Sequence, residues 1–307
     1  MESSKTRARV ICNPASGGGC DPGAVREALG DLDIEWIDTE GSGDAREAAR
    51  EWGEGLLIVV GGDGTVNEAV NGLGKAGFPE GVTLAVLPMG TGNDLAATLA
   101  IPARIEDAEK VIRENRVRVL DVARVRSEGV EERFFINVAT GGFGAETSSL
   151  ADEELKGRWG KLAYLRASLE RARDFEVRDV RVVLDDVEYT IRAVNVAVGN
   201  CRYAGGGWLA APRANPEDGL LDLVVIAQVG LKEVLALAPA ALAKSDYLDT
   251  EGVFSARAKK IRVETRPGGL EFTADGEVIG DEPVEFEIIP HALKVVAGPE
   301  YVPEPGG

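Results

Sequence analysis

The sequence predicts an α/β fold in two parts: an N-terminal doubly wound parallel-sheet domain over residues 1–122, and a C-terminal β-rich, mainly antiparallel domain over residues 123–307. Three observations lead to this prediction. Strand and helix patterns alternate over residues 7–120, the order that builds a parallel sheet. Short strand patterns then follow one another, as in antiparallel sheets. A chain of 307 residues is also long enough for two cores, although the last strands could return to the first domain.

The first domain is expected to alternate four strands with four helices. Each strand is a short apolar run, and the helices show apolar residues three or four positions apart, the spacing of one helix face. The expected strands cover residues 8–12, 34–37, 56–60 and 83–87. The expected helices cover residues 24–29, 44–52 and 65–73, and a fourth begins over 95–99.

The second domain is expected to consist mostly of strands. They cover residues 133–138, 180–184, 193–198, 221–226, 260–264, 270–273 and 285–289. Helical patterns remain at about 153–173 and 231–243. Basic residues surround apolar ones in the first of these, which indicates either a membrane-facing helix or, by preference, a core face with solvated charges.

Composition excludes several classes of protein. A net charge of -18 disfavours nucleic acid as a partner, because phosphate backbones are held mainly by Lys and Arg. No apolar run approaches the roughly 18 residues of a membrane span. The first five residues lack the apolar core of a signal peptide, so a cytoplasmic location is expected. Three scattered cysteines are too few for a disulfide framework or a CxxC metal site.

The most informative segment is the turn after the third expected strand, Val60-Gly61-Gly62-Asp63-Gly64-Thr65-Val66-Asn67-Glu68. Glycines permit positive φ and close backbone approach, and the following helix presents free N–H groups to an anion. A carboxylate beside phosphates is repulsive unless a divalent cation or a reacting proton lies between them. Asp63 therefore suggests metal-assisted phosphoryl chemistry, whereas Gly-Gly alone would also fit an ordinary strand-to-helix turn.

Two further glycine-bearing turns follow other expected strands of the first domain. They are Asn13-Pro14-Ala15-Ser16-Gly17 and Pro88-Met89-Gly90-Thr91-Gly92-Asn93-Asp94. Ligands of parallel sheets bind outside the carboxyl ends of the strands, so three such turns predict one shared site. Ser16 and Thr91 could instead be helix caps.

Together with Asp275-Gly276-Glu277, these segments resemble the diacylglycerol-kinase-like lipid kinases, the family of bacterial diacylglycerol kinases, sphingosine kinases and ceramide kinases. The motifs stand in the family's order over nearly the whole chain. The resemblance implies a kinase that uses ATP and Mg²⁺ to phosphorylate the hydroxyl of a membrane lipid alcohol, diacylglycerol or a related lipid. It also implies ATP between the two domains and peripheral contact with a membrane. Exposed strand edges make a homodimer reasonable.

The resemblance assigns nucleotide binding to the turns of the first domain. Backbone N–H groups and short hydroxyls there can hold phosphates without lysine. The matching residues are Asn13, Pro14, Ala15, Ser16, Gly17, Thr39, Gly62, Asp63, Gly64, Thr65, Val66, Asn67, Glu68 and Thr91.

The resemblance assigns the catalytic roles to three carboxylates. Glu277 matches the family's general base, and Asp63 would act with Mg²⁺ on the phosphates. Asp121 matches an aspartate that supports the active-site network through water and magnesium. Considered without the other motifs, Glu277 would be an exposed residue of an Asp-Gly hairpin.

A second magnesium position is implied by the segment Asn215-Pro216-Glu217-Asp218-Gly219-Leu220-Leu221-Asp222. Asp218 would be the side-chain ligand, with the backbone carbonyls of Asn215 and Leu220 beside it. Oxygen ligands on a tight loop suit Mg²⁺, although the composition also fits a plain turn.

One departure from the family concerns the lipid. Bacterial diacylglycerol kinases carry basic residues just after the first glycine turn, where this chain has Gly18, Gly19 and Cys20. The sequence therefore does not name the lipid. Two other functions stay open: an NAD-kinase-like small-molecule kinase, and a nucleotide-binding regulator without catalysis.

Overall fold

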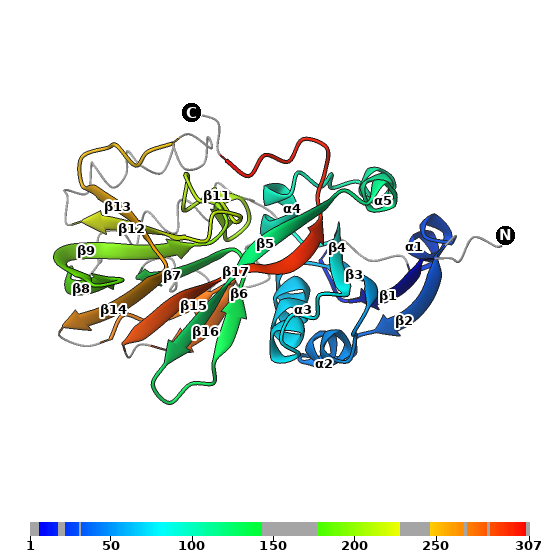
Figure 1. Ribbon diagram of the computed structural model, residues 1–307, viewed down its shortest axis with the longest axis horizontal. Helices are drawn as coiled ribbons and strands as arrows, with labels where there is room; N and C mark the ends of the chain where they lie inside the picture. The colour runs from blue at the N-terminus through cyan, green and yellow to red at the C-terminus, as the bar shows by residue number, and fades with distance from the viewer. Residues whose placement is uncertain are drawn as a thin grey trace.

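Two lobes joined by two long strands make up the structure, a computed structural model that describes residues 6–17, 22–30, 32–142, 177–227, 246–266, 269–280 and 283–304. Figure 1 shows the helix-bearing N-terminal lobe and the β-rich lobe, connected by β5 (Val117–Ser127) and β17 (Val284–Val296). The expected α/β fold, parallel first and antiparallel afterwards, is confirmed.

The first lobe is a parallel sheet with strand order β4-β3-β1-β2. Figure 1 shows α2 and α3 on one face and α1 and α5 on the other. Because both faces are covered, β3 is apolar at nearly every position. The elements are β1 (Arg7–Cys12), α1 (Pro22–Ala28), β2 (Asp33–Asp38), α2 (Asp44–Arg50), β3 (Gly55–Gly61), α3 (Asp63–Lys75), β4 (Val82–Pro88), α4 (Asp94–Thr98) and α5 (Ile105–Glu114).

The second lobe consists of antiparallel strands. The main run of its sheet has the order β16-β15-β7-β9-β8-β14-β17; in addition, β12 pairs with β9, and β13 pairs with β12. Strands β8 and β17 alternate buried and more exposed residues, as strands with one solvated face do, whereas β12 and the second half of β9 are buried almost throughout. The elements are β6 (Arg133–Phe135), β7 (Val138–Gly142), β8 (Arg178–Leu184), β9 (Val187–Gly199), β10 (Tyr203–Ala204), β11 (Trp208–Leu209), β12 (Leu221–Ala227), β13 (Val253–Ala258), β14 (Lys260–Arg266), β15 (Phe272–Ala274) and β16 (Glu277–Gly280).

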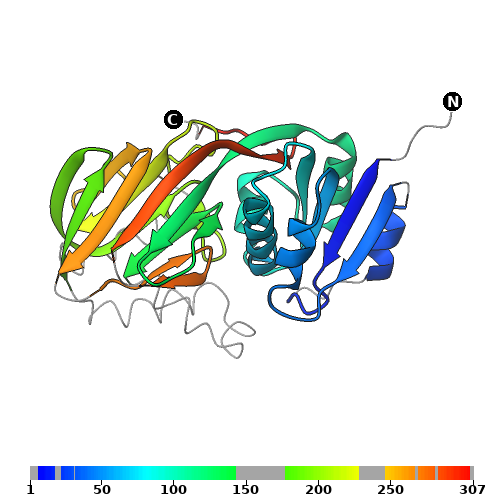
Figure 2. The same ribbon diagram turned by 60° about the horizontal axis from the view of Figure 1, so that its bottom comes forward.

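Strands β5 and β17 connect the two lobes through continuous backbone pairing. Figure 2 shows both strands running from the β-rich lobe into the first lobe. Along β5, Val122 packs in the core of the first lobe and Ala123 in the core of the second. Strand β17 pairs antiparallel with β5 and then parallel with β4, at Lys294 and Val295. Within the described residues, fifteen strands thus form one continuous sheet, which fixes the lobes relative to each other.

The structure adds elements that the sequence analysis did not predict. Helix α5 and strand β13 were not expected, and α3 begins at Asp63, two residues earlier than predicted. The helical patterns at 153–173 and 231–243, and the departure at 18–20, lie outside the described residues. Among the helices that the structure describes, none is long and apolar enough to cross a membrane.

Candidate functional site

The three glycine-bearing turns lie side by side at the carboxyl ends of β1, β3 and β4. The turn after β1 contacts α3, because Asn13 Nδ2 donates to Thr65 Oγ1 at 3.2 Å. The turns after β3 and β4 touch through their backbones. A Cβ on Gly90 would lie 2.6 Å from the Gly62 Cα, so a larger residue would push the turns apart. The sheet therefore brings the predicted phosphate-binding turns together.

Asp63 joins two of these turns. It is the first residue of α3, and its carboxylate oxygens accept the backbone N–H groups of Asn93 and Asp94, both at 2.7 Å. Burial raises the pKa of Asp63, and the two amide hydrogen bonds oppose that rise. Each carboxylate oxygen has a second lone pair, so these contacts leave capacity for a divalent cation.

The turn after β1 is mostly exposed. Pro14, Ala15 and Gly17 are exposed, whereas Asn13 and Ser16 are half-buried. Asn13 organises the turn: its Oδ1 accepts the Ala15 N–H at 3.0 Å, and its carbonyl accepts the Ser16 hydroxyl at 2.8 Å. Because the Ser16 hydroxyl donates within the turn, its oxygen can still accept a hydrogen bond from a ligand.

Two predicted nucleotide contacts have other surroundings in the structure. The Val66 side chain is buried in the first core, so only its backbone could reach a ligand. Glu68 points to the start of α2, where its Oε1 accepts the Gly43 N–H at 2.9 Å. Thr39 stays beside the first turn, because its N–H donates to the Cys12 carbonyl at 2.8 Å. The Glu68 side chain, in contrast, stabilises the loop before α2 through its hydrogen bond to Gly43.

A contact between the lobes was missed by the sequence analysis. Asp94, the first residue of α4, accepts the N–H groups of Gly206 at 3.1 Å and Gly207 at 2.7 Å. Both glycines have positive φ, which allows consecutive amides to converge on one carboxylate. Asp94 thus holds the β10–β11 turn of the second lobe against the turn after β4. The motif containing Asp94 was recognised, but its partner lies 112 residues away.

The β15–β16 hairpin brings carboxylates from the second lobe toward α3. Asp275 at its tip accepts a hydrogen bond from Asn67 Nδ2 at 3.4 Å. Burial raises the pKa of Asp275 to about 6, against the effect of its hydrogen bonds. Glu277 begins β16; its side chain is 56% exposed, and its Oε2 lies 3.5 Å from Arg133 Nη1. The predicted base is therefore on the same hairpin, accessible to solvent.

Asp121 lies fully buried where β5 passes from one core to the other. Its carboxylate accepts the backbone N–H groups of His291 and Gly219, both at 2.7 Å. His291 has a positive φ and lies where the β5–β17 pairing shifts register. Burial raises the pKa of Asp121. In the structure, this residue braces the junction of the lobes, and its predicted role in the active-site network stays a prediction.

Comparison with known proteins assigns both lobes to one family. Residues 7–125 match the family model described as the diacylglycerol kinase catalytic domain. Residues 137–297, just over half of the chain, match the one described as the YegS C-terminal NAD kinase beta sandwich-like domain. The chain belongs to the diacylglycerol-kinase-like lipid kinase family. This confirms the resemblance read from the motifs and makes the protein a kinase-type transferase.

Individual members of this family are similar along almost the whole chain. A protein of Yersinia pestis (strain Pestoides F), named "Probable lipid kinase YegS-like", is 31% identical over 278 residues, covering 88% of this chain and 90% of the relative. A structure described as a diacylglycerol kinase from Bacillus anthracis (strain Sterne) has a TM-score of 0.76 and 27% identity, covering 98% of this chain and all of the other. An NAD kinase from Archaeoglobus fulgidus in complex with ATP shares the fold, with a TM-score of 0.54 and 17% identity over 96% of this chain and 95% of the other.

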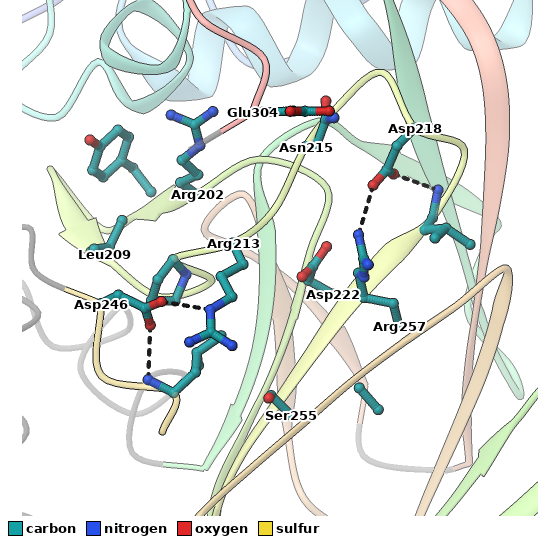
Figure 3. A pocket seen from close by; sticks show the side chains of 15 residues that line it. Arg202, Leu209, Arg213, Asn215, Asp218, Asp222, Asp246, Ser255, Arg257 and Glu304 are labelled. Atoms are coloured by element: carbon teal, nitrogen blue, oxygen red, sulfur yellow. Dashed lines mark hydrogen bonds and ion pairs between the residues drawn. The ribbon is translucent and has the colours of Figure 1, made fainter. Parts of the chain in front are cut away.

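The second magnesium position implied by the family already holds a positive side chain. Figure 3 shows Asp218 and Arg257 at a cavity of about 890 Å³. Asp218 Oδ2 accepts from Arg257 Nη1 at 3.2 Å, and Oδ1 accepts the Leu220 N–H at 3.0 Å. Buried Asp222 lies opposite Arg257 in the β12–β13 pair. Burial and the charge of Asp218 raise the pKa of Asp222 to about 7, while Arg257 opposes the rise.

A metal at this loop would therefore have to compete with the Arg257 guanidinium for Asp218. Among the described residues, no group of three or more His, Cys, Asp or Glu is arranged to hold a metal. The second Mg²⁺ stays a prediction, and the arginine supplies a competing source of positive charge.

Replacing Arg257 by methionine tests this competition. We expect Arg257→Met to lower the melting temperature by at most about 2 °C, because a partly exposed ion pair contributes about 1 kcal/mol or less. We also expect millimolar Mg²⁺ to raise the melting temperature of the variant more than that of the unmodified protein. Asp218→Asn in the same background is the control and should remove the response. A magnesium response of the unmodified protein that Asp218→Asn abolishes would show instead that metal binds alongside Arg257.

Proposed function

We propose that the protein is an ATP- and Mg²⁺-dependent lipid kinase that transfers the γ-phosphate to the hydroxyl of a membrane lipid alcohol. The observation that carries this proposal is the juxtaposition of two half-sites. The adjacent turns of the first lobe offer backbone amides, short hydroxyls and Asp63, and the hairpin with Glu277 touches the same helix, α3, through Asp275 and Asn67.

The turns of the first lobe would hold the nucleotide. Backbone N–H groups at the start of α3 and the Ser16 hydroxyl of the turn after β1 can bind phosphate oxygens without a lysine. Asp63 fits a magnesium ion, because its oxygens keep acceptor capacity and Mg²⁺ commonly uses one or two carboxylates with phosphates and water. When bound there, Mg²⁺ would neutralise charge on the phosphates.

Glu277 would accept the proton of the lipid hydroxyl. An exposed carboxylate can receive a proton from an alcohol that approaches from solvent or from a membrane surface. Arg133, 3.5 Å away, would hold the carboxylate in one orientation. Positioning and charge neutralisation then supply most of the rate enhancement, as in other phosphoryl transfers. A peripheral position at the membrane follows from this substrate.

The direct test is phosphate transfer from radiolabelled ATP into a total lipid extract, followed by identification of the labelled lipid. Diacylglycerol, a sphingoid base and an isoprenoid alcohol are assayed separately, because each offers one hydroxyl. NAD is a further substrate arm, since the fold is shared with an NAD kinase. Label in a lipid fraction supports the proposal. Label in NAD alone, or no transfer to any acceptor, overturns it.

A further inference from the structure

In the Asp275-Gly276 turn, the side chain of the first residue points into the protein and accepts backbone hydrogen bonds. Asp275 has φ 47° and Gly276 φ 86°, the left-handed conformations of a tight two-residue hairpin between β15 and β16. Aspartate suits such a turn on conformational grounds alone, with its side chain in water. In this hairpin the carboxylate is partly buried and faces the protein.

The Asp275 carboxylate binds three consecutive backbone amides. It accepts the N–H groups of Ile136 at 2.9 Å, Asn137 at 3.0 Å and Val138 at 3.2 Å, where the chain leads from β6 into the first residue of β7. The Asp275 N–H also donates to the Val138 carbonyl at 3.2 Å. Charge-assisted hydrogen bonds of this kind fix the orientation of the turn more firmly than the two-residue loop would by itself.

Hydrogen bonds join both the hairpin and strand β6 to α3, the helix that begins at Asp63. Asn67 Nδ2, one helical turn after Asp63, donates to Asp275. One further turn along, the Asn71 amide donates to the Phe134 carbonyl at 2.8 Å and accepts the Phe134 N–H at 3.0 Å. The helix and the hairpin therefore meet through a short polar chain, although they come from different lobes.

We propose that Asp275 is a positioning residue that sets where Glu277 lies relative to the turns around Asp63. The inference rests on the proposed function, in which Glu277 is the proton acceptor. Glu277 lies two residues beyond Asp275 on the short strand β16, so a rotation of the turn would move its carboxylate directly. A displacement of about 1 Å at a reacting group can lower a rate by about 100-fold.

Asp275→Asn is the test, since Asn-Gly keeps the preference for this turn but presents an amide where the carboxylate met backbone N–H groups. We expect kcat for lipid phosphorylation to fall about 10- to 100-fold while the KM for ATP stays within about twofold. The matched control is Asp185→Asn. Asp185 has φ 49° and accepts the Lys259 and Lys260 N–H groups at 3.2 and 2.9 Å, but these contacts lie within the second lobe. This control should change melting temperature only.

The double variant with Glu277→Gln separates the two proposals. If Asp275 acts through Glu277, adding Asp275→Asn to Glu277→Gln causes no further loss of kcat. Two results overturn the positioning role and leave the proposed function intact. The first is an unchanged kcat in Asp275→Asn. The second is that Asp275→Asn lowers kcat as much in the Glu277→Gln background as it does alone. Full turnover by Glu277→Gln alone would instead remove the proposed base.

Should Asp275→Asn not fold, Gly276→Ala is tested in its place. The added methyl group would meet no atom within 4 Å, yet it would strain the turn, because Gly276 has a positive φ. An unchanged kcat in this variant also overturns the positioning role.

Discussion

Glu277→Gln is expected to lower turnover by about 10²- to 10⁴-fold while leaving ATP binding nearly unchanged. Glutamine has the same size as glutamate but cannot accept the proton of the lipid hydroxyl. The side chain is more than half exposed, and its ion pair with Arg133 is partly solvated, so the fold should lose little stability. Turnover is measured by steady-state kinetics with the lipid that the labelling assay identifies, ATP binding by calorimetry, and stability by a melting curve.

The control for Glu277→Gln is a neighbouring glutamate with no assigned role. Glu271 is exposed and immediately precedes β15 on the same hairpin. Glu271→Gln removes the same charge near the same site, so it reports the effect of net charge alone. Equal activities of the two variants would contradict the assignment of Glu277, whereas a loss confined to Glu277→Gln would support it.

The parallel sheet of the first lobe was predictable because its information is local. Strand β3 and helix α3 show their burial in consecutive residues, and Val66, Ala69, Val70 and Leu73 are buried on one face as their spacing predicted. The return of β17 to β4 depends on pairing between residues more than 200 positions apart, as at Thr83 and Lys294. No local pattern encodes such pairing, so only the suggestion that the last strands could return was available from sequence.

The candidate site was predictable as a set of turns, and its side-chain directions were not. The motifs place Glu68 and Asn67 in one string, yet one side chain binds the start of α2 and the other the second lobe. Likewise, Asp94 and Asp275 belong to recognised motifs, but their amide partners are supplied by distant segments. A sequence motif records which residues are present, whereas the tertiary fold decides what each carboxylate contacts.

Asp63→Asn is expected to reduce turnover by at least about 100-fold and to raise the Mg²⁺ concentration required for half-maximal activity. The structure gives Asp63 two separable roles: it anchors the turn after β4 through two amides, and it is the proposed magnesium ligand. Asparagine keeps one acceptor and turns its NH₂ toward the other amide, which costs about 1–3 kcal/mol of stability. Turnover alone would mix these two effects.

The matched control for the anchoring role is Asp44→Asn. Asp44 is also the first residue of a helix, and its Oδ2 accepts the backbone N–H groups of Glu40 and Gly41, both at 2.8 Å. Loss of this anchor should lower the melting temperature without changing the magnesium requirement. If Asp63→Asn behaves in the same way, Asp63 is an anchor and the metal is held elsewhere. If only Asp63→Asn shifts the magnesium requirement, the Asp63 carboxylate contacts the ion. Loosening a turn that does not bind the ion would not selectively lower the affinity for Mg²⁺.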